Sequence, residues 1–214
     1  MHYTRLTDGR LVTLSVPRLS GGNYSGPVDY TVRNLAGRVE ARGVIALGGG
    51  TTSTGPSSWI SSSADLIGAV NTTYGTLEKL SVSLYSEPGT ELDETRLFHA
   101  IPAAYSSAAA GTHYNATTYA YDAAGRGIRT VDPTGTITYQ DRDTLGRVEF
   151  VYVGTNDNGW VKGGTSGTNN MVAVETVEYD GGGVGNSRVT VRKSHPTSSS
   201  GDDRSTLFTY DYRG

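Results

Sequence analysis

The sequence predicts an all-β fold of short antiparallel strands joined by tight turns. First, Asp and Gly recur at positions i and i+3, the spacing of type I turns in bulged hairpins, with six or seven residues between consecutive turns. Second, several segments alternate apolar and polar residues, as strands with one buried face do. Third, no segment carries a convincing helical apolar stripe with caps, and the best candidate, residues 63–70, is interrupted by Gly68.

Strands are expected where β-branched and aromatic residues gather or where apolar and polar residues alternate. In chain order these segments are Leu11–Val16, Val39–Leu47, Leu80–Leu84, Arg126–Val131, Thr136–Arg142, Val148–Tyr152, Val172–Thr176, Val189–Arg192 and Leu207–Tyr210. Two Gly/Ser/Thr-rich stretches, residues 48–63 and 154–170, are predicted to be long loops. They hold the two tryptophans, Trp59 and Trp160.

The turns between the strands are the most precisely predicted feature of the sequence. In each Asp-x-x-Gly unit the carboxylate is expected to accept hydrogen bonds from turn amides, while the glycine takes a positive φ. We predict positive φ at Gly125 and Gly146 in particular, and Pro133 presets φ in a further turn. The four predicted turns are Asp122–Gly125, Asp132–Gly135, Asp143–Gly146 and Asp211–Gly214.

Length and composition favour a folded, turn-rich chain. A chain of 214 residues can bury about 70% of its unfolded surface. Its 36% hydrophobic and 18% charged residues fall below the globular norm, because Gly, Ser and Thr take up the difference. Glycine and proline, 29 and 7 residues, stay short of the share that signals low complexity.

Charge and residue usage exclude several classes of protein. A net charge of −3 offers no basic footprint for nucleic acid, so we expect no nucleic-acid partner. The absence of cysteine removes disulfides, thiol nucleophiles and thiolate metal sites. No apolar run approaches a membrane span, and the first ten residues lack the apolar stretch of a signal peptide. We therefore expect neither a membrane span nor an export signal within this chain.

A degenerate repeat runs through the sequence. Residues 119–126 read Tyr-Ala-Tyr-Asp-Ala-Ala-Gly-Arg, residues 139–147 read Tyr-Gln-Asp-Arg-Asp-Thr-Leu-Gly-Arg, and their Gly-Arg pairs lie 21 residues apart. Weaker copies occur at residues 3–10, 30–38, 178–192 and 207–214. The signature residues are Tyr119, Tyr121, Asp122, Gly125, Arg126, Asp132, Pro133, Gly135, Tyr139, Asp143, Gly146, Arg147, Tyr210, Asp211 and Gly214.

This Tyr-Asp and Gly-Arg spacing resembles the Rhs/YD-repeat family. The resemblance implies a β-spiral sheet that forms part of a hollow shell in a very large secreted or cell-surface protein, such as bacterial Rhs proteins, toxin-complex C components and teneurins. It implies flanking repeats of a longer parent chain as partners, and an enclosed toxin domain or cell-surface glycans beyond them. The family's self-cleavage motif contains an Asp-Pro-x-Gly sequence, but residues 132–135 continue into Thr136 without the rest of that motif, so we interpret them as a repeat turn.

Three sections of the chain are expected. Residues 1–47 form degenerate repeat strands, and residues 119–214 form the repeat segment, truncated at its C-terminal end. Residues 48–118 are either a loop with diverged repeats or an inserted β module, and the sequence leaves both open. Terminal repeats without caps expose strand edges, so we also expect frayed ends or self-association.

The sequence offers no catalytic, cofactor or metal site. Its four histidines lack metal-ligand spacing, and its glycine runs lack the features of a phosphate loop. Residues 156–159, Asn-Asp-Asn-Gly, lack the closing glutamate of a calcium loop, which favours an Asx-turn. We expect a protein that is not an enzyme.

Two functional interpretations remain beside a hydrolase, which has little support. The first is a structural section of a repeat shell. The second is a carbohydrate-binding β module in which tyrosines, Trp59 and Trp160 stack on sugars. For Tyr119 and Tyr121 we favour cross-strand or cation–π contacts with Arg126 over a sugar platform, because the motif recurs as a building unit would.

Overall fold

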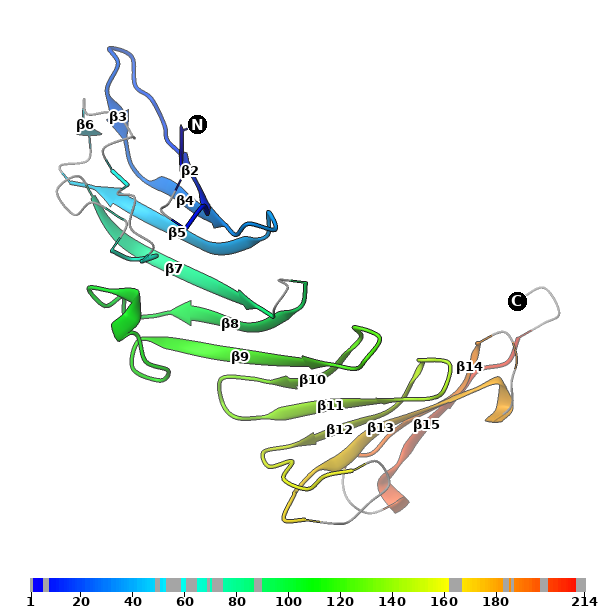
Figure 1. The fold of residues 1–214 in the computed structure, drawn as a ribbon. Helices are drawn as coiled ribbons and strands as arrows, with labels where there is room; N and C mark the ends of the chain where they lie inside the picture. Colours follow the sequence, from blue (N-terminus) through cyan, green and yellow to red (C-terminus); the bar gives the residue numbers. More distant parts are fainter. Residues whose placement is uncertain are drawn as a thin grey trace. The chain divides into compact units, whose positions relative to one another are not determined.

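A computed structural model describes residues 2–5, 8–48, 51–52, 59–60, 65–68, 70, 75–86, 90–161, 167–182, 185, 187–196 and 200–210. The predicted all-β, antiparallel class is confirmed: each strand of the main sheet pairs with the next strand of that sheet along the chain (Figure 1). The chain divides into two units, Met1–Thr117 and Thr118–Gly214, which are described separately. The division falls inside strand β9 (Tyr114–Tyr121).

The first unit is a meander with the order β1-β2-β4-β5-β7-β8. Its strands are β1 (His2–Arg5), β2 (Leu11–Ser15), β4 (Val28–Arg33), β5 (Val39–Leu47), β7 (Gly75–Tyr85) and β8 (Leu92–Phe98). A small separate pair is formed by β3 (Tyr24–Ser25) and β6 (Thr51–Thr52). The strands β7 and β8 lie within residues 48–118 and continue the meander.

One face of this sheet carries the hydrophobic core. Period-two alternation along β4 buries Val28, Tyr30 and Val32. The segments between β6 and β7 supply Trp59 and Leu66, which are buried in the same core. The hydroxyl of Tyr30 donates a hydrogen bond to the Leu66 carbonyl at 3.0 Å, and burial raises the pKa of that hydroxyl. The core is thus the sheet face together with the chain segments that cover it.

Gly43 on β5 is required by close packing. A Cβ at this position would lie 2.7 Å from the Lys79 carbonyl oxygen, 2.8 Å from Leu77 Cδ1 and 3.2 Å from Tyr30 Cδ1. A side chain here would therefore push directly against the β7 backbone and the Tyr30 ring.

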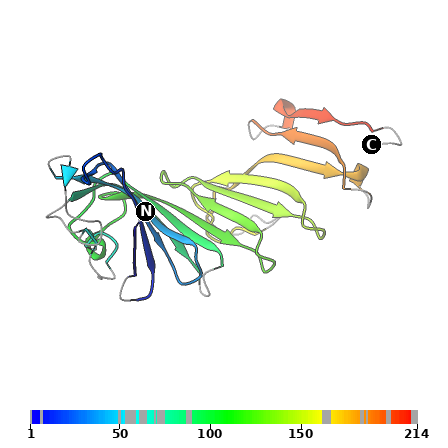
Figure 2. The same cartoon turned by 90° about the horizontal axis from the view of Figure 1, so that it is seen from above.

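The second unit is also a meander, in the order β9-β10-β11-β12-β13-β14-β15. Its hairpins are seen from above in Figure 2. The strands after β9 are β10 (Gly127–Val131), β11 (Ile137–Arg142), β12 (Val148–Gly154), β13 (Val172–Tyr179), β14 (Val189–Ser194) and β15 (Arg204–Leu207). Because neighbouring strands alternate in direction, the turns after β9, β11 and β13 all lie at the same end of the strands. We call this row of turns one edge of the sheet.

Burial in the second unit is shallow. Among its described residues, only Ile137 and Val177 are buried hydrophobics, and most strand residues are half-buried. Its strands must therefore be held together largely by their ladders, by cross-strand side-chain pairs and by contacts at the turns.

Most predicted strands are found, with shifted ends. The segment Val39–Leu47 agrees with β5, whereas the predicted Leu80–Leu84 is the middle of the longer β7. The prediction for Leu207–Tyr210 is wrong in its extent, because β15 ends at Leu207.

In the described residues the helical content is three short 3₁₀ turns, Tyr105–Ser107, Asp180–Gly182 and Ser200–Asp202. None of the helices in the described part of the chain is long and apolar enough to cross a membrane.

Candidate functional site: the repeated turn network

The Asp-x-x-Gly turns have the predicted geometry. Asp122 Oδ1 accepts hydrogen bonds from the amides of Ala124 at 2.9 Å and Arg126 at 3.0 Å. Gly125, at φ +74°, donates its amide to the Asp122 carbonyl at 2.9 Å. The prediction of a carboxylate-bonded turn with a left-handed glycine is therefore confirmed here.

The turn after β11 repeats this arrangement. Asp143 Oδ1 accepts from the amides of Leu145 and Arg147, both at 2.9 Å, and Gly146 has φ +85°. The turn after β10 is the variant without arginine: Asp132 Oδ1 accepts from the amides of Thr134 at 2.8 Å and Thr136 at 3.0 Å. Asp211 and Gly214, the fourth predicted turn, lie outside the described residues.

The arginine of each signature turn holds the carboxylate of its own turn. Arg126 Nε lies 2.7 Å from Asp122 Oδ2, and Arg147 Nε lies 2.7 Å from Asp143 Oδ2. Hydrogen bonds from the backbone and side chain of Arg126 hold the pKa of Asp122 below its usual value. Burial alone would raise the pKa of Asp143, but the hydrogen bonds from Arg147 lower it overall.

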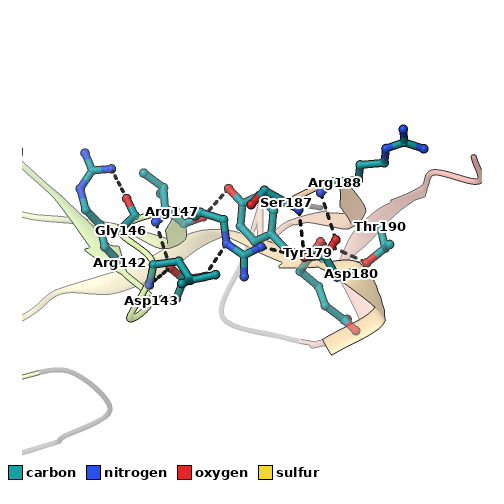
Figure 3. A network of polar contacts seen from close by, with 12 residues as sticks. Arg142, Asp143, Gly146, Arg147, Tyr179, Asp180, Ser187, Arg188 and Thr190 are labelled. Carbon is teal, nitrogen blue, oxygen red and sulfur yellow. Dashed lines mark hydrogen bonds and ion pairs between the residues drawn. The ribbon is translucent and has the colours of Figure 1, made fainter. Parts of the chain in front are cut away.

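Arg147 also reaches the next turn on the same edge (Figure 3). Its Nη1 lies 2.8 Å from Asp180 Oδ2, and its guanidinium carbon lies 4.3 Å from the centroid of the Tyr179 ring. The Tyr179 hydroxyl in turn donates a hydrogen bond to the Val148 carbonyl at 3.0 Å. We call this arrangement the Arg–Tyr clamp: the arginine of one turn, the carbonyl of the residue after it, and the tyrosine that precedes the next turn.

The Arg–Tyr clamp recurs in both units. Arg188 lies 5.0 Å from the Tyr210 ring centroid, and the Tyr210 hydroxyl donates to the Val189 carbonyl at 2.8 Å. In the first unit, Arg38 lies 5.5 Å from the Tyr85 ring centroid. The Tyr85 hydroxyl donates to the Val39 carbonyl at 3.0 Å. Cation–π contacts of this kind contribute about 0.5–1 kcal/mol when exposed and more when desolvated.

At one turn, an arginine makes the contact with a backbone carbonyl that a tyrosine hydroxyl makes in the clamps. Arg142 stands directly before Asp143, where the copies at Asp122, Asp180 and Asp211 have tyrosine, and its Nη2 donates to the Gly127 carbonyl at 2.9 Å. Its Nη1 donates to the Gly146 carbonyl of its own turn at 3.1 Å. Arg33, before the Asn34 turn, likewise donates to the Gly37 carbonyl at 3.0 Å. A guanidinium here replaces the tyrosine hydroxyl as the donor between turns.

The turn after β13 is an expanded copy of the signature. Asp180, at φ +56°, donates its amide to the Arg188 carbonyl at 2.9 Å, and its Oδ1 accepts from the Arg188 amide at 3.2 Å. The closing partners are eight residues apart in sequence instead of four. The sequence marks this copy only weakly, through Tyr179 followed by Asp180, because the intervening residues displace the arginine.

The remaining signature residues form packing contacts. Tyr139 and Tyr152 face each other across β11 and β12, and the Trp160 ring lies 4.2 Å and 5.0 Å from their ring centroids. For Arg126, the expected contact with Tyr119 or Tyr121 stays a prediction. Its guanidinium pairs with Asp122 and fills the space that a Cβ on Gly146 would need.

The proposed sugar-stacking role of Trp59 is wrong. Its side chain is 1% exposed and packs edge-on against Tyr24, with ring centroids 5.6 Å apart. A ring buried in this way presents no face to a sugar. Trp160 is half-buried against its two tyrosines.

The predicted Asx-turn at residues 156–159 is confirmed. Asn156 Oδ1 accepts from the Asn158 amide at 3.0 Å. The Asp157 carboxylate pairs with Arg129 Nε at 2.5 Å, and this contact lowers the pKa of Asp157. Within the part of the chain that the structure describes, no three His, Asp or Glu side chains are grouped as metal ligands would be.

Sequence reasoning missed one polar cluster around His195. Its Nδ1 lies 2.8 Å from Asp203 Oδ1, and its Nε2 lies 2.8 Å from Thr176 Oγ1. The imidazole thereby joins the connection between β14 and β15 to β13. The three residues are scattered in the sequence, and only the strand order brings them together.

Comparisons with known proteins give distant structural similarity. No protein-family model and no curated protein matches the sequence. The crystal structure of TcdB2-TccC3-Cdc42 aligns over 90% of this chain at 13% identity with a TM-score of 0.35, and that of TcdB2-TccC3 over 99% at 12% identity with a TM-score of 0.33. The Photorhabdus luminescens Tc holotoxin pore aligns over 90% at 11% identity with a TM-score of 0.29. This chain spans 9–11% of the length of those chains.

Proposed function

We propose that this chain is a non-catalytic structural section of an Rhs/YD-repeat shell that belongs to a secreted or cell-surface protein. The observation that carries the proposal is the Arg–Tyr clamp, which ties the turns that end in Arg38, Arg147 and Arg188 to the tyrosine before the following turn. Because the clamp recurs at Arg38, Arg147 and Arg188, it is a repeated structural contact and not a single catalytic or binding site.

The shallow burial of the second unit supports the same role. A sheet with so few buried side chains gains its stability from neighbour to neighbour along the array, as repeat proteins do. Flanking repeats of a longer parent chain would continue that array. An enclosed toxin domain or glycans at a cell surface would be the partners of the assembled shell.

Electron microscopy of the chain expressed together with the coding sequence that flanks it tests the shell. We expect a hollow particle whose wall includes this segment. A solid globule or an unstructured tail at this segment would overturn the proposal.

Hydrogen exchange tests the repeat character of the chain itself. In the variant Arg147→Ala, we expect lost amide protection in β12, β13 and β14, with the first unit unchanged, because repeat stability is a sum of neighbour terms. An equal loss of amide protection across both units would contradict the repeat character of the chain. Turnover of an ester, peptide or glycoside by the purified chain, abolished by a point substitution, would contradict the non-catalytic part.

A further inference from the structure

A hollow of about 390 Å³ lies among the turns of the first unit. The turns after β1, β4 and β7 lie at the same end of the strands, because neighbouring strands alternate in direction, and all three border the hollow. Its lining combines the apolar side chains of Leu35 and Leu84 with the charged side chains of Arg10 and Glu40. The volume lies at the lower end of the range of ligand pockets, about 300–1,000 Å³.

The Arg–Tyr clamps show what the arginine of a signature turn faces elsewhere in the chain. When the register of each strand pair is continued into the turn, the arginine stands opposite its tyrosine: Arg38 opposite Tyr85, Arg147 opposite Tyr179, and Arg188 opposite Tyr210.

The first turn departs from this rule. The register of β2 and β4, continued by one residue, places Asn34 opposite Arg10. The side chain of Asn34 caps its own turn, because its Oδ1 accepts from the Arg38 amide at 2.9 Å. The residue that faces Arg10 therefore supplies no aromatic ring, and the hollow lies beside this arginine.

Two ion pairs fix the position of Arg10. Its Nε lies 2.5 Å from Asp8 Oδ2, and its Nη1 donates to Glu40 Oε1 at 3.2 Å. The side chains of Arg10 and Glu40 are 11% and 21% exposed, so their charges are partly shielded from water. A cation–π contact is stronger at a shielded cation than at a fully exposed one. Arg10 thus offers a fixed, partly desolvated cation to a ring in the hollow.

Glu40 offers an acceptor that the fold leaves unused. Its Oε2 is buried and makes no hydrogen bond to any residue that the structure describes. Buried polar atoms without a partner are rare in folded proteins, because they lose the hydrogen bonds that water would give them. A rotation of the carboxylate toward the hollow would let a hydroxyl donor there complete the hydrogen bonding of Glu40.

We propose that this hollow, the Arg10 notch, binds the side chain of a tyrosine carried by an extended segment of a partner protein. The ring packs against the Arg10 guanidinium, and the phenol hydroxyl donates to the Glu40 carboxylate. Leu35 is 81% exposed, so a ring that covers it and Leu84 removes apolar surface from water. The partner's tyrosine thereby makes the kind of contact that the Arg–Tyr clamps make within the chain.

Other side chains fit the Arg10 notch less well. Asp8 and Glu40 are both paired with Arg10, and the positive charge of Arg10 repels the cation of a lysine. A leucine offers no π face to the guanidinium, and a phenylalanine offers no donor to Glu40. The inference concerns recognition of a partner, which goes beyond the structural role proposed above.

Two-dimensional ¹H–¹⁵N NMR of the full chain tests the proposal, with the capped peptide acetyl-Gly-Tyr-Gly-amide as the probe. Peptides with phenylalanine, leucine or lysine in place of tyrosine are the comparison ligands. We expect the tyrosine peptide to shift the amide signals of Gly9, Gly37 and Ser86, which belong to the three turns around the notch. It should bind at least threefold more tightly than the phenylalanine peptide, and more tightly still than the leucine and lysine peptides.

Substitutions in the chain identify the binding groups. Arg10→Ala removes the cation and should weaken binding of the tyrosine peptide at least fivefold. Because Arg10 also holds Asp8 and Glu40, Leu35→Ala is a second variant at an exposed position, and it should weaken binding about threefold. Arg42→Ala is the matched control, because Arg42 is exposed on β5 and lies outside the described lining of the notch. It should leave the affinity unchanged.

The NMR spectra of each variant also show whether the fold is intact, since signals far from the substitution should keep their positions. The proposal is overturned if the tyrosine peptide shifts no signal of the three turns, or if another of the peptides binds as tightly. It is also overturned if Arg10→Ala or Leu35→Ala affects the affinity no more than Arg42→Ala does.

Discussion

The Arg147 guanidinium lies 4.3 Å from the ring centroid of Tyr179, a residue 32 positions further along the chain. The same arginine holds Asp143 in its own turn and Asp180 in the next. Its side chain is 17% exposed and that of Asp180 is 7% exposed, so these ion pairs are partly shielded from water. This arginine links two turns, and the predictions for the second unit follow from that link.

Removing the hydroxyl of Tyr179 tests the clamp directly. Tyr179→Phe keeps the ring under Arg147 but removes the donor to the Val148 carbonyl, so the free energy of unfolding should fall by about 0.5–1.5 kcal/mol. Urea unfolding of the second unit measures the change. Tyr139→Phe is the matched control, because its ring packs on Trp160, and it should change stability less. Equal effects of both substitutions would show that the Arg–Tyr clamp does not stabilise the second unit.

Valine at Gly125 or Gly146 should cost more than about 1 kcal/mol, because both glycines have positive φ. Gly146→Ala should destabilise more than Gly125→Ala, since the Arg126 guanidinium fills the space of the new Cβ at Gly146. Thermal unfolding compares the variants. Gly127→Ala is the control: its Cβ would meet Tyr121 only at 4.0 Å, with no positive φ. A neutral valine at either turn would contradict the bulged hairpin.

The acid dependence of stability should report on Asp143. Its pKa is lowered in the folded chain, so the ionised carboxylate stabilises the fold above its ordinary pKa, and that contribution is lost as pH falls through the folded value. Asp143→Asn should therefore lower stability at neutral pH and reduce the further loss on acidification. Urea midpoints at about pH 7 and about pH 3 measure both effects. Leu145→Asn changes an exposed residue of the same turn without altering charge, and its acid dependence should parallel that of the unmodified chain.

Alanine at Gly43 should destabilise the first unit by about 1–3 kcal/mol, the usual range for overpacking. The new Cβ would meet the Lys79 carbonyl oxygen at 2.7 Å, and backbone cannot move aside as a flexible side chain can. Fluorescence of Trp59, measured with Trp160→Phe as background, follows the core of this unit. A Gly43→Ala variant as stable as that background would show that the sheet can separate here at no cost.

Local chemistry let the sequence predict much of the second unit. An Asp carboxylate and a glycine three residues later contain all the groups that a turn needs, so the turns at residues 122–125, 132–135 and 143–146 needed no tertiary information. Alternation with period two likewise located β5 and the middle of β7. The end of β15 was misplaced, because pairing with β14 and not composition sets its length.

The contacts between turns depend on which strands become neighbours, and that is a property of the tertiary structure. The tyrosines of the Arg–Tyr clamps lie 21, 31 and 46 residues from the carbonyls that they bind, because the intervening loops differ in length. No fixed spacing could reveal them, nor the joining of Asp180 to Arg188 or of His195 to Thr176. The burial of Trp59 was also decided only by folding, since a tryptophan in a Gly/Ser/Thr-rich loop is covered or exposed according to which sheet face lies beneath it. The sequence by itself determined the turns and the strand class, because their interactions are local. The tertiary structure determined the network that joins the turns, because its partners meet only after the strands have paired.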